Sequence, residues 1–185
     1  PNRIKVYNTD SKIIVMLRNP VDRAFSHYLM DYRLGLTSES FESEFHKKKG
    51  LNFQQYFLLG KYSSQVKRYI DVFGRENIHF IWYSDFKKDS EKQLNKVVDF
   101  IGLESDFRVD FDTIYNSFSM PKNNLIRMIY SVVWLRKLLT FLFPSSLVKS
   151  IKYLLFSKGN KPKLSDLTRS TVLEYYKSDI EELEK

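Results

Sequence analysis

The chain has 185 residues, of which 43% are hydrophobic and 28% charged, and its net charge is +8. This composition excludes a disordered or low-complexity protein and allows one domain with a hydrophobic core. With no cysteine, the chain cannot form disulfides, thiolate metal sites or a cysteine nucleophile. The three histidines (His27, His46 and His79) are scattered and form no HExxH pattern, so we expect no metal site.

The positive charge is concentrated in one segment. Residues 113–165 contain no Asp or Glu, whereas the rest of the chain is nearly neutral. The segment favours an anionic partner such as a phosphate, a sulfated glycan, a nucleic acid or an anionic lipid, or else forms a solvated basic surface. Its basic residues are Lys122, Arg127, Arg136, Lys137, Lys149, Lys152, Lys158, Lys161 and Lys163.

The first half predicts strands alternating with helices. Residues 12–18 form a short β-branched apolar run, typical of a buried strand in a parallel sheet. Asn19 is a good N-cap and Pro20 suits the first helical position, which predicts a helix to about Gly35. Further helices are expected near 39–49, 51–59 and 61–73, and a second strand at 78–83. Asp89 or Ser90 can cap another helix, whose apolar positions run to Ile101. This alternation predicts an α/β architecture with right-handed crossovers.

The second half predicts mainly helices, at 122–143, 145–156 and 165–184, with a break at Pro144. Within the first, residues 125–143 are mostly apolar, but Arg127, Arg136 and Lys137 oppose insertion into a membrane. In one continuous helix Arg127 and Arg136 project from opposite sides, which favours a helix packed on the protein. We expect Trp82 and Trp134 in the core.

The segment from Arg18 to Ser26 suggests a phosphate site. Arg18 ends the first predicted strand, at the sheet edge where open α/β sheets bind ligands. The helix from Pro20 is expected to point free N–H groups and its positive dipole end at the same place. Ser26 lies two turns beyond Asn19 on the same helix face. Arg18 and Ser26 would then bind a phosphate; the alternative is an ordinary turn with a salt-bridged arginine.

This segment resembles the 3′-phosphate-binding motif of sulfotransferases, which use 3′-phosphoadenosine 5′-phosphosulfate (PAPS). Arg18, Asn19-Pro20, Arg23 and Ser26 match the motif. In the family the matching Arg and Ser bind the 3′-phosphate of the nucleotide. The resemblance continues in order along the chain, through Gly60-Lys61-Tyr62, Tyr83-Ser84-Asp85-Phe86, Phe100-Ile101-Gly102-Leu103, Asn116-Ser117, Pro121-Lys122, and Leu173-Glu174-Tyr175-Tyr176 with Asp179.

The resemblance implies a P-loop-like three-layer sulfotransferase fold, with a parallel sheet flanked by helices, incomplete and mostly helical in its C-terminal half. The family's 5′-phosphosulfate loop, a Lys-x-Gly-Thr-like turn, does not occur here. We therefore expect residues 1–185 to be a single partial domain, inactive alone, with that loop and the catalytic base upstream of residue 1. Arg18, Ser26 and Lys122 are the expected nucleotide contacts. Tyr62 and Tyr83 are expected to be buried aromatics.

The implied reaction transfers a sulfuryl group from PAPS to a hydroxyl or amine, expected on a carbohydrate, and releases adenosine 3′,5′-bisphosphate. No nucleic-acid partner is expected, and residues 122–163 are a candidate for peripheral membrane contact. In a bacterial protein the expected compartment is the cytoplasm. Two alternatives stay open: a P-loop kinase-like enzyme fragment, and a non-enzymatic basic module that binds anionic membrane or nucleic acid.

Overall fold

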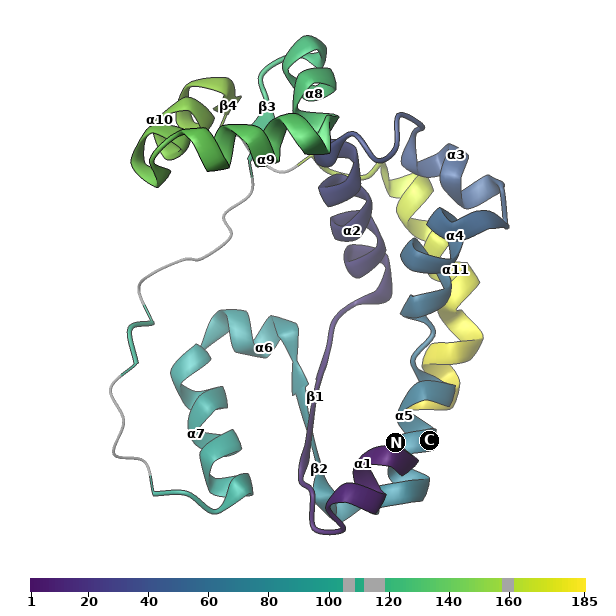
Figure 1. Ribbon diagram of the computed structural model, residues 1–185. Coiled ribbons are helices and arrows are strands. Elements are labelled where there is room, and N and C mark those ends of the chain that lie inside the picture. The colour runs from purple at the N-terminus through teal and green to yellow at the C-terminus, as the bar shows by residue number, and fades with distance from the viewer. Residues whose placement is uncertain (105–108, 112–118, 158–161) are drawn as a thin grey trace.

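The computed structural model describes residues 1–104, 109–111, 119–157 and 162–185 (Figure 1). Asn116, Ser117, Lys158 and Lys161 lie outside the described residues. The elements are α1 (Asn2–Tyr7), β1 (Ile13–Leu17), α2 (Pro20–Leu34), α3 (Phe41–His46), α4 (Gly50–Tyr56), η1 (Leu58–Gly60), α5 (Ser63–Phe73), η2 (Arg75–Asn77), β2 (Ile78–Trp82), α6 (Tyr83–Lys88), α7 (Ser90–Ile101), β3 (Met120–Pro121), α8 (Asn124–Ser131), α9 (Val133–Leu142), α10 (Ser145–Leu155), β4 (Phe156–Ser157) and α11 (Asp166–Leu183).

The two longer strands form a parallel pair, in which Ile13 lies opposite Ile78 and Leu17 opposite Trp82. Parallel strands need a long crossover, which the helices α2 to α5 supply. In the view of Figure 1, α6 and α7 lie to one side of the strands and α1 and α5 to the other. Both α5 and α7 contact β2. The expected α/β architecture with a parallel sheet is therefore confirmed.

Strand β1 differs from its prediction in burial. Leu17 is buried, but Ile14 and Met16 are 45% and 47% exposed. Successive side chains of a strand point to opposite faces, so Ile14 and Met16 share one face and Leu17 lies on the other. In the described structure one face of β1 is therefore open, whereas its continuous apolar run predicted burial on both faces.

The hydrophobic core lies beside the sheet, between α2, α3, α4 and α11. Helix α2 contributes apolar residues at the helical spacing of three and four. The aromatic rings meet mainly edge to face, an arrangement that their quadrupoles favour. This packing fixes α2, and with it the turn that carries Arg18. The core residues are Val21, Ala24, Phe25, Tyr28, Leu29, Phe41, Phe45, Phe53, Tyr56, Phe57, Val172 and Tyr176.

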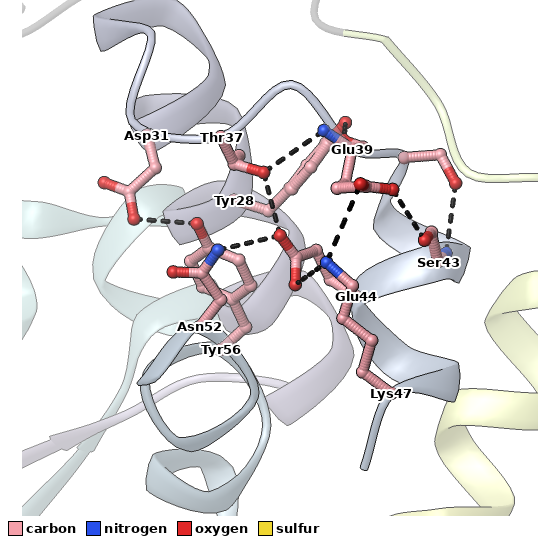
Figure 2. A network of polar contacts seen from close by, with 10 residues as sticks. Tyr28, Asp31, Thr37, Glu39, Ser43, Glu44, Lys47, Asn52 and Tyr56 are labelled. Atoms are coloured by element: carbon pink, nitrogen blue, oxygen red, sulfur yellow. Dashed lines mark hydrogen bonds and ion pairs between the residues drawn. The ribbon is translucent and has the colours of Figure 1, made fainter. Parts of the chain in front are cut away.

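A buried polar network closes this core at the C-terminal half of α2 (Figure 2). Glu44, only 2% exposed, accepts hydrogen bonds from Thr37 Oγ1 at 2.8 Å, Asn52 Nδ2 at 2.7 Å and Lys47 Nζ at 3.2 Å. Burial alone would raise the pKa of Glu44, but the hydrogen bonds from Asn52, Thr37 and Lys47 outweigh it and leave the pKa below its ordinary value. Glu44 therefore joins the turn after α2 to α3 and α4 as a carboxylate.

In the second half of the chain, α8 to α10 with the β3–β4 ribbon (residues 119–157) form what we call the helical lobe. It lies at one end of the molecule in Figure 1. Arg127 of α8 stacks on Tyr32 of α2, with its guanidinium carbon 4.1 Å from the ring centroid. The lobe therefore packs on the C-terminal end of α2, while the sheet lies toward the other end.

The predicted helix 122–143 is wrong, because the chain breaks at Val132 into α8 and α9. Ser131 Oγ donates to the Met128 carbonyl at 2.6 Å, which gives that carbonyl a partner outside the helical ladder. Two β-branched valines follow, and Val132 is extended at φ −76°, ψ 100°. Arg127 and Arg136 thus lie on separate helices, so the argument from one continuous helix does not apply.

The core prediction for both tryptophans is also wrong. Trp82 is 50% exposed and Trp134 is 66% exposed. Trp82 lies at the end of β2, where the sheet edge opens to a pocket. Trp134 lies on an outward face of α9.

Among the described residues, no helix combines the length and hydropathy needed to span a bilayer.

Candidate functional site

A pocket of about 580 Å³ lies at the carboxyl ends of β1 and β2. The turn from β1 to α2, the residue before α5, the junction of β2 with α6 and the end of α11 all contribute to it. This is the edge at which open α/β sheets bind ligands. The pocket is lined by Leu17, Arg18, Asn19, Pro20, Asp22, Tyr62, Trp82, Tyr83, Ser84, Lys87, Ile180, Leu183 and Glu184.

Arg18 lies in this pocket as the sequence predicted, and its partner is an aromatic ring. Its guanidinium carbon lies 4.8 Å from the centroid of the Tyr83 ring. Within the described part of the chain, no carboxylate forms an ion pair with Arg18. The half-buried guanidinium keeps its charge and its forked donors for an incoming anion.

The N-terminus of α2 does not offer the free N–H groups that we expected. Asn19 Oδ1 accepts hydrogen bonds from the Val21 N–H at 3.0 Å and the Asp22 N–H at 3.2 Å. Pro20 has no N–H, and the Arg23 N–H donates to the Asn19 carbonyl. The N-cap that starts the helix thus also fills its first donors, so anion binding here depends on Arg18 and the helix dipole.

The structure does not place the other two predicted contacts in the pocket lining. Ser26 lies half-buried on α2, and its hydroxyl makes no hydrogen bond with the described residues. Lys122 is exposed on the helical lobe, and its N–H donates to the Leu155 carbonyl at 3.0 Å. Because the lobe contacts the far end of α2, Lys122 and Arg18 belong to opposite ends of that 15-residue helix, which is about 22 Å long.

Sequence reasoning missed two residues of the pocket. Tyr83 was expected to be buried, but it is 37% exposed and faces Arg18. Lys87, one helical turn after Tyr83, adds a second cation to the lining. The second strand was expected to include Tyr83, but β2 ends at Trp82 and Tyr83 begins α6, and the helical turn brings positions 83 and 87 to the same face.

Residues 3–128 match the sulfotransferase domain model, which covers more than half of the chain. This chain belongs to the sulfotransferase domain family. It is 27% identical over 124 residues to mouse sulfotransferase 2A6, covering 64% of this chain and 41% of that protein. Rat sulfotransferase 2A6 is 28% identical over 127 residues, covering 64% and 42%. This chain therefore spans about two fifths of the length of these curated relatives.

A solved structure agrees with the family. The crystal structure of a sulfotransferase from Alicyclobacillus acidocaldarius is 31% identical and superimposes with a TM-score of 0.54. The match covers 74% of this chain and 57% of that one. The resemblance and the fold class inferred from the sequence are therefore confirmed. The family match includes Arg18, Tyr62 and Tyr83, but ends before α9, α10 and α11.

Arg23, the second arginine of the sulfotransferase motif, makes contacts within the protein. Its Nη2 donates to the carbonyls of Gln55 at 2.7 Å and Tyr56 at 2.6 Å. These carbonyls end α4, where a cation also opposes the negative end of the helix dipole. Arg23 therefore fixes α2 to α4, and Arg18 is the motif arginine that faces the pocket.

Helix α11 holds the opposite wall of the pocket. Asp179, only 8% exposed, accepts hydrogen bonds from the Tyr62 N–H and from Ser63 Oγ, both at 2.6 Å. It thereby caps α5 from a position 116 residues away in sequence. The same contact places Tyr62 in the lining of the pocket rather than in the core as we expected. Burial raises the pKa of the Tyr62 hydroxyl, so it stays protonated at neutral pH.

The packing around Gly60 explains why a glycine is needed at the first position of the Gly60-Lys61-Tyr62 segment. A Cβ at Gly60 would lie 2.7 Å from the hydroxyl oxygen of Tyr176, closer than side-chain carbons approach. The Tyr176 hydroxyl donates to the Phe57 carbonyl at 2.9 Å, which holds its fully buried ring against this turn. The absence of a side chain at position 60 therefore lets α11 approach the turn before α5.

Proposed function

We propose that this sulfotransferase-family chain binds the adenosine 3′-phosphate part of PAPS in the pocket at the ends of β1 and β2. The observation that carries the proposal is Arg18, a half-buried arginine at the pocket with no carboxylate partner among the described residues. A buried or half-buried arginine is commonly paired, because an unneutralised charge is costly to desolvate. A phosphate group supplies the missing anion and matches the planar fork of the guanidinium.

The surroundings of Arg18 suit a nucleotide. The Tyr83 ring covers one face of the Arg18 guanidinium, so the N–H donors in the plane of that group can contact a phosphate. Trp82 and Tyr62 add flat apolar surface against which a purine can pack. Lys87 supplies a second positive charge in the same lining. Ser26 lies on α2 outside the pocket lining and stays proposed as a secondary contact, whereas Lys122 lies at the opposite end of α2 and is not assigned to this pocket.

The reaction that we propose is sulfuryl transfer to a hydroxyl or amine of an acceptor, for which the sequence resemblance suggests a carbohydrate. The acceptor oxygen or nitrogen forms a bond to sulfur, and its proton passes to a base that we assign to no residue of this chain. The bond from sulfur to the 5′-phosphate oxygen breaks, and adenosine 3′,5′-bisphosphate leaves with the charge. The part of Arg18 is to hold the 3′-phosphate and so orient the donor.

Calorimetric titration of the chain with three nucleotides tests this proposal against its alternatives. We expect adenosine 3′,5′-bisphosphate to bind at least tenfold more tightly than adenosine 5′-phosphate, because only the bisphosphate carries the group assigned to Arg18. A preference for magnesium ATP would favour a kinase-like site instead. Equal affinities that fall together with rising salt would indicate a non-specific basic module.

A further inference from the structure

Helix α9 is apolar on two faces. Its inward residues Leu135 and Leu139 line an apolar cavity of about 190 Å³ that α8 and α10 complete. Its outward residues Trp134, Leu138 and Phe141 are 66%, 41% and 87% exposed. At 100° per residue these three fall within a sector of about 60°, so they form one stripe along the helix. We call Trp134, Leu138 and Phe141 the α9 ridge.

The α9 ridge faces away from the interior of the helical lobe. The inward face of α9 already supplies the contacts that bury the lobe interior, whereas the ridge lies outside it. Contiguous exposed apolar surface on a folded domain usually marks an interaction site. The neighbouring helices α8 and α10 also carry exposed apolar side chains, each more than 40% exposed: Leu125, Met128, Leu147, Tyr153 and Leu154.

The basic residues near the ridge favour an anionic partner. Lys137 lies at the edge of the ridge, about 40° around α9 from Phe141 at 100° per residue, and is exposed, as is Lys122 where the chain enters α8. The sequence from 113 to 165 contains no acidic residue. Apolar and aromatic side chains combined with lysines and no carboxylates suit the interface of a bilayer that contains anionic lipids.

We propose that the α9 ridge docks on the surface of an anionic lipid bilayer. Trp134, Leu138 and Phe141 enter the interfacial region, and Lys137 and Lys122 contact the lipid headgroups. The contact is peripheral, and no described helix spans the bilayer. The ridge lies beyond the residues that match the family model, and the lobe packs at the end of α2 far from Arg18. Docking therefore leaves the nucleotide pocket accessible, and the proposal does not depend on the one made for that pocket.

Vesicle co-sedimentation at about 0.1 M salt tests this docking. We expect binding to vesicles of phosphatidylcholine and phosphatidylglycerol at 70:30, and at least tenfold weaker binding to phosphatidylcholine alone, because the charge contribution is then absent. Phe141→Ser should weaken binding to the anionic vesicles by about tenfold, since it removes the most exposed apolar side chain of the ridge. Tyr7→Ser is the matched control, because Tyr7 is 93% exposed on α1 and should leave binding unchanged.

Tryptophan fluorescence gives a second measurement. The chain has two tryptophans, so Trp82→Phe leaves Trp134 as the only emitter. We expect its emission to shift to shorter wavelength when anionic vesicles are added. An unshifted spectrum, equal binding to neutral and anionic vesicles, or an unchanged affinity in Phe141→Ser would overturn the proposal. Self-association that Phe141→Ser abolishes would assign the ridge to a second copy of the chain and would overturn it as well.

Discussion

Replacing Asp179 by alanine should destabilise the protein more than replacing any other carboxylate near the end of α11. Asp179 is 8% exposed and accepts two hydrogen bonds of 2.6 Å, from the Tyr62 N–H and from Ser63 Oγ. A third, longer contact of 3.4 Å reaches the Ser63 N–H. The variant Asp179→Ala therefore leaves donors at the start of α5 without an acceptor.

The expected magnitude follows from these contacts. A hydrogen bond to a charged group contributes about 1.5–3 kcal/mol, and water entering the site regains part of the loss. We therefore expect Asp179→Ala to lower the free energy of unfolding by about 2–4 kcal/mol. Ser63→Ala removes one of the two short bonds and should cost about 1–2 kcal/mol. Because both changes break the same bond, the double variant should lose less than the sum of the two single variants.

Urea unfolding followed by circular dichroism measures these differences by linear extrapolation. Glu182→Ala is the matched control, because it removes an exposed carboxylate three residues further along α11 and should change stability by less than about 0.5 kcal/mol. A loss in Asp179→Ala no larger than that of the control would refute the capping role. Strict additivity with Ser63→Ala would refute the coupling between α11 and α5.

Three further changes test other contacts. Gly60→Ala should lower stability by about 1–3 kcal/mol in the same urea experiment, because the new methyl group meets the Tyr176 hydroxyl; an unchanged midpoint would contradict this. Arg23→Gln should lower stability by about 1.5–3 kcal/mol yet change bisphosphate affinity far less than Arg18→Ala; the opposite ranking would exchange the two roles. The pKa of Glu44 is lower in the folded chain than its ordinary 4.5, so the unfolded state binds more protons and stability falls as pH drops below about 4.5. In Glu44→Gln this acid-dependent part should vanish, and identical pH profiles would contradict it.

Short sequence motifs correctly predicted the strand-to-helix turn that carries Arg18, because contacts between neighbouring residues form this turn. Asn19 and Pro20 mark the start of α2, and Gly35 ends it in the left-handed conformation at φ 72°, as a C-cap glycine does. The strand before them pairs in parallel as its β-branched residues indicated. Arg18 therefore lies at the edge of the sheet, as its position directly after the predicted strand indicated.

Long-range contacts decided what the sequence could not show. The capping of α5 by Asp179 joins residues 116 positions apart, and no periodicity predicts such a pair. The stacking of Arg18 on Tyr83 depends on α6 starting where a strand was expected to continue. The free N–H groups expected at α2 are occupied because Asn19, correctly predicted as the N-cap, uses its own side chain to bind them.

The segment 122–143 was harder to predict because its apolar residues do not fall on a single helix face. Residues 122–143 fit one long helix by composition, and the break at Val132 depends on the bond from Ser131 Oγ to the Met128 carbonyl. With the break, α9 turns two apolar faces in different directions, so Trp134 lies at the surface rather than in the core.

The assignment of Arg18 to the 3′-phosphate is tested most directly by comparing two ligands in two proteins. Calorimetry with adenosine 3′,5′-bisphosphate and adenosine 5′-phosphate isolates the contribution of the 3′-phosphate in the wild type and in Arg18→Ala. A charge-assisted contact of about 1.5–3 kcal/mol corresponds to a roughly 10- to 150-fold preference for the bisphosphate. We predict that the wild type shows this preference and that Arg18→Ala loses it while binding adenosine 5′-phosphate as before. An Arg18→Ala variant that keeps the full preference would contradict the assignment.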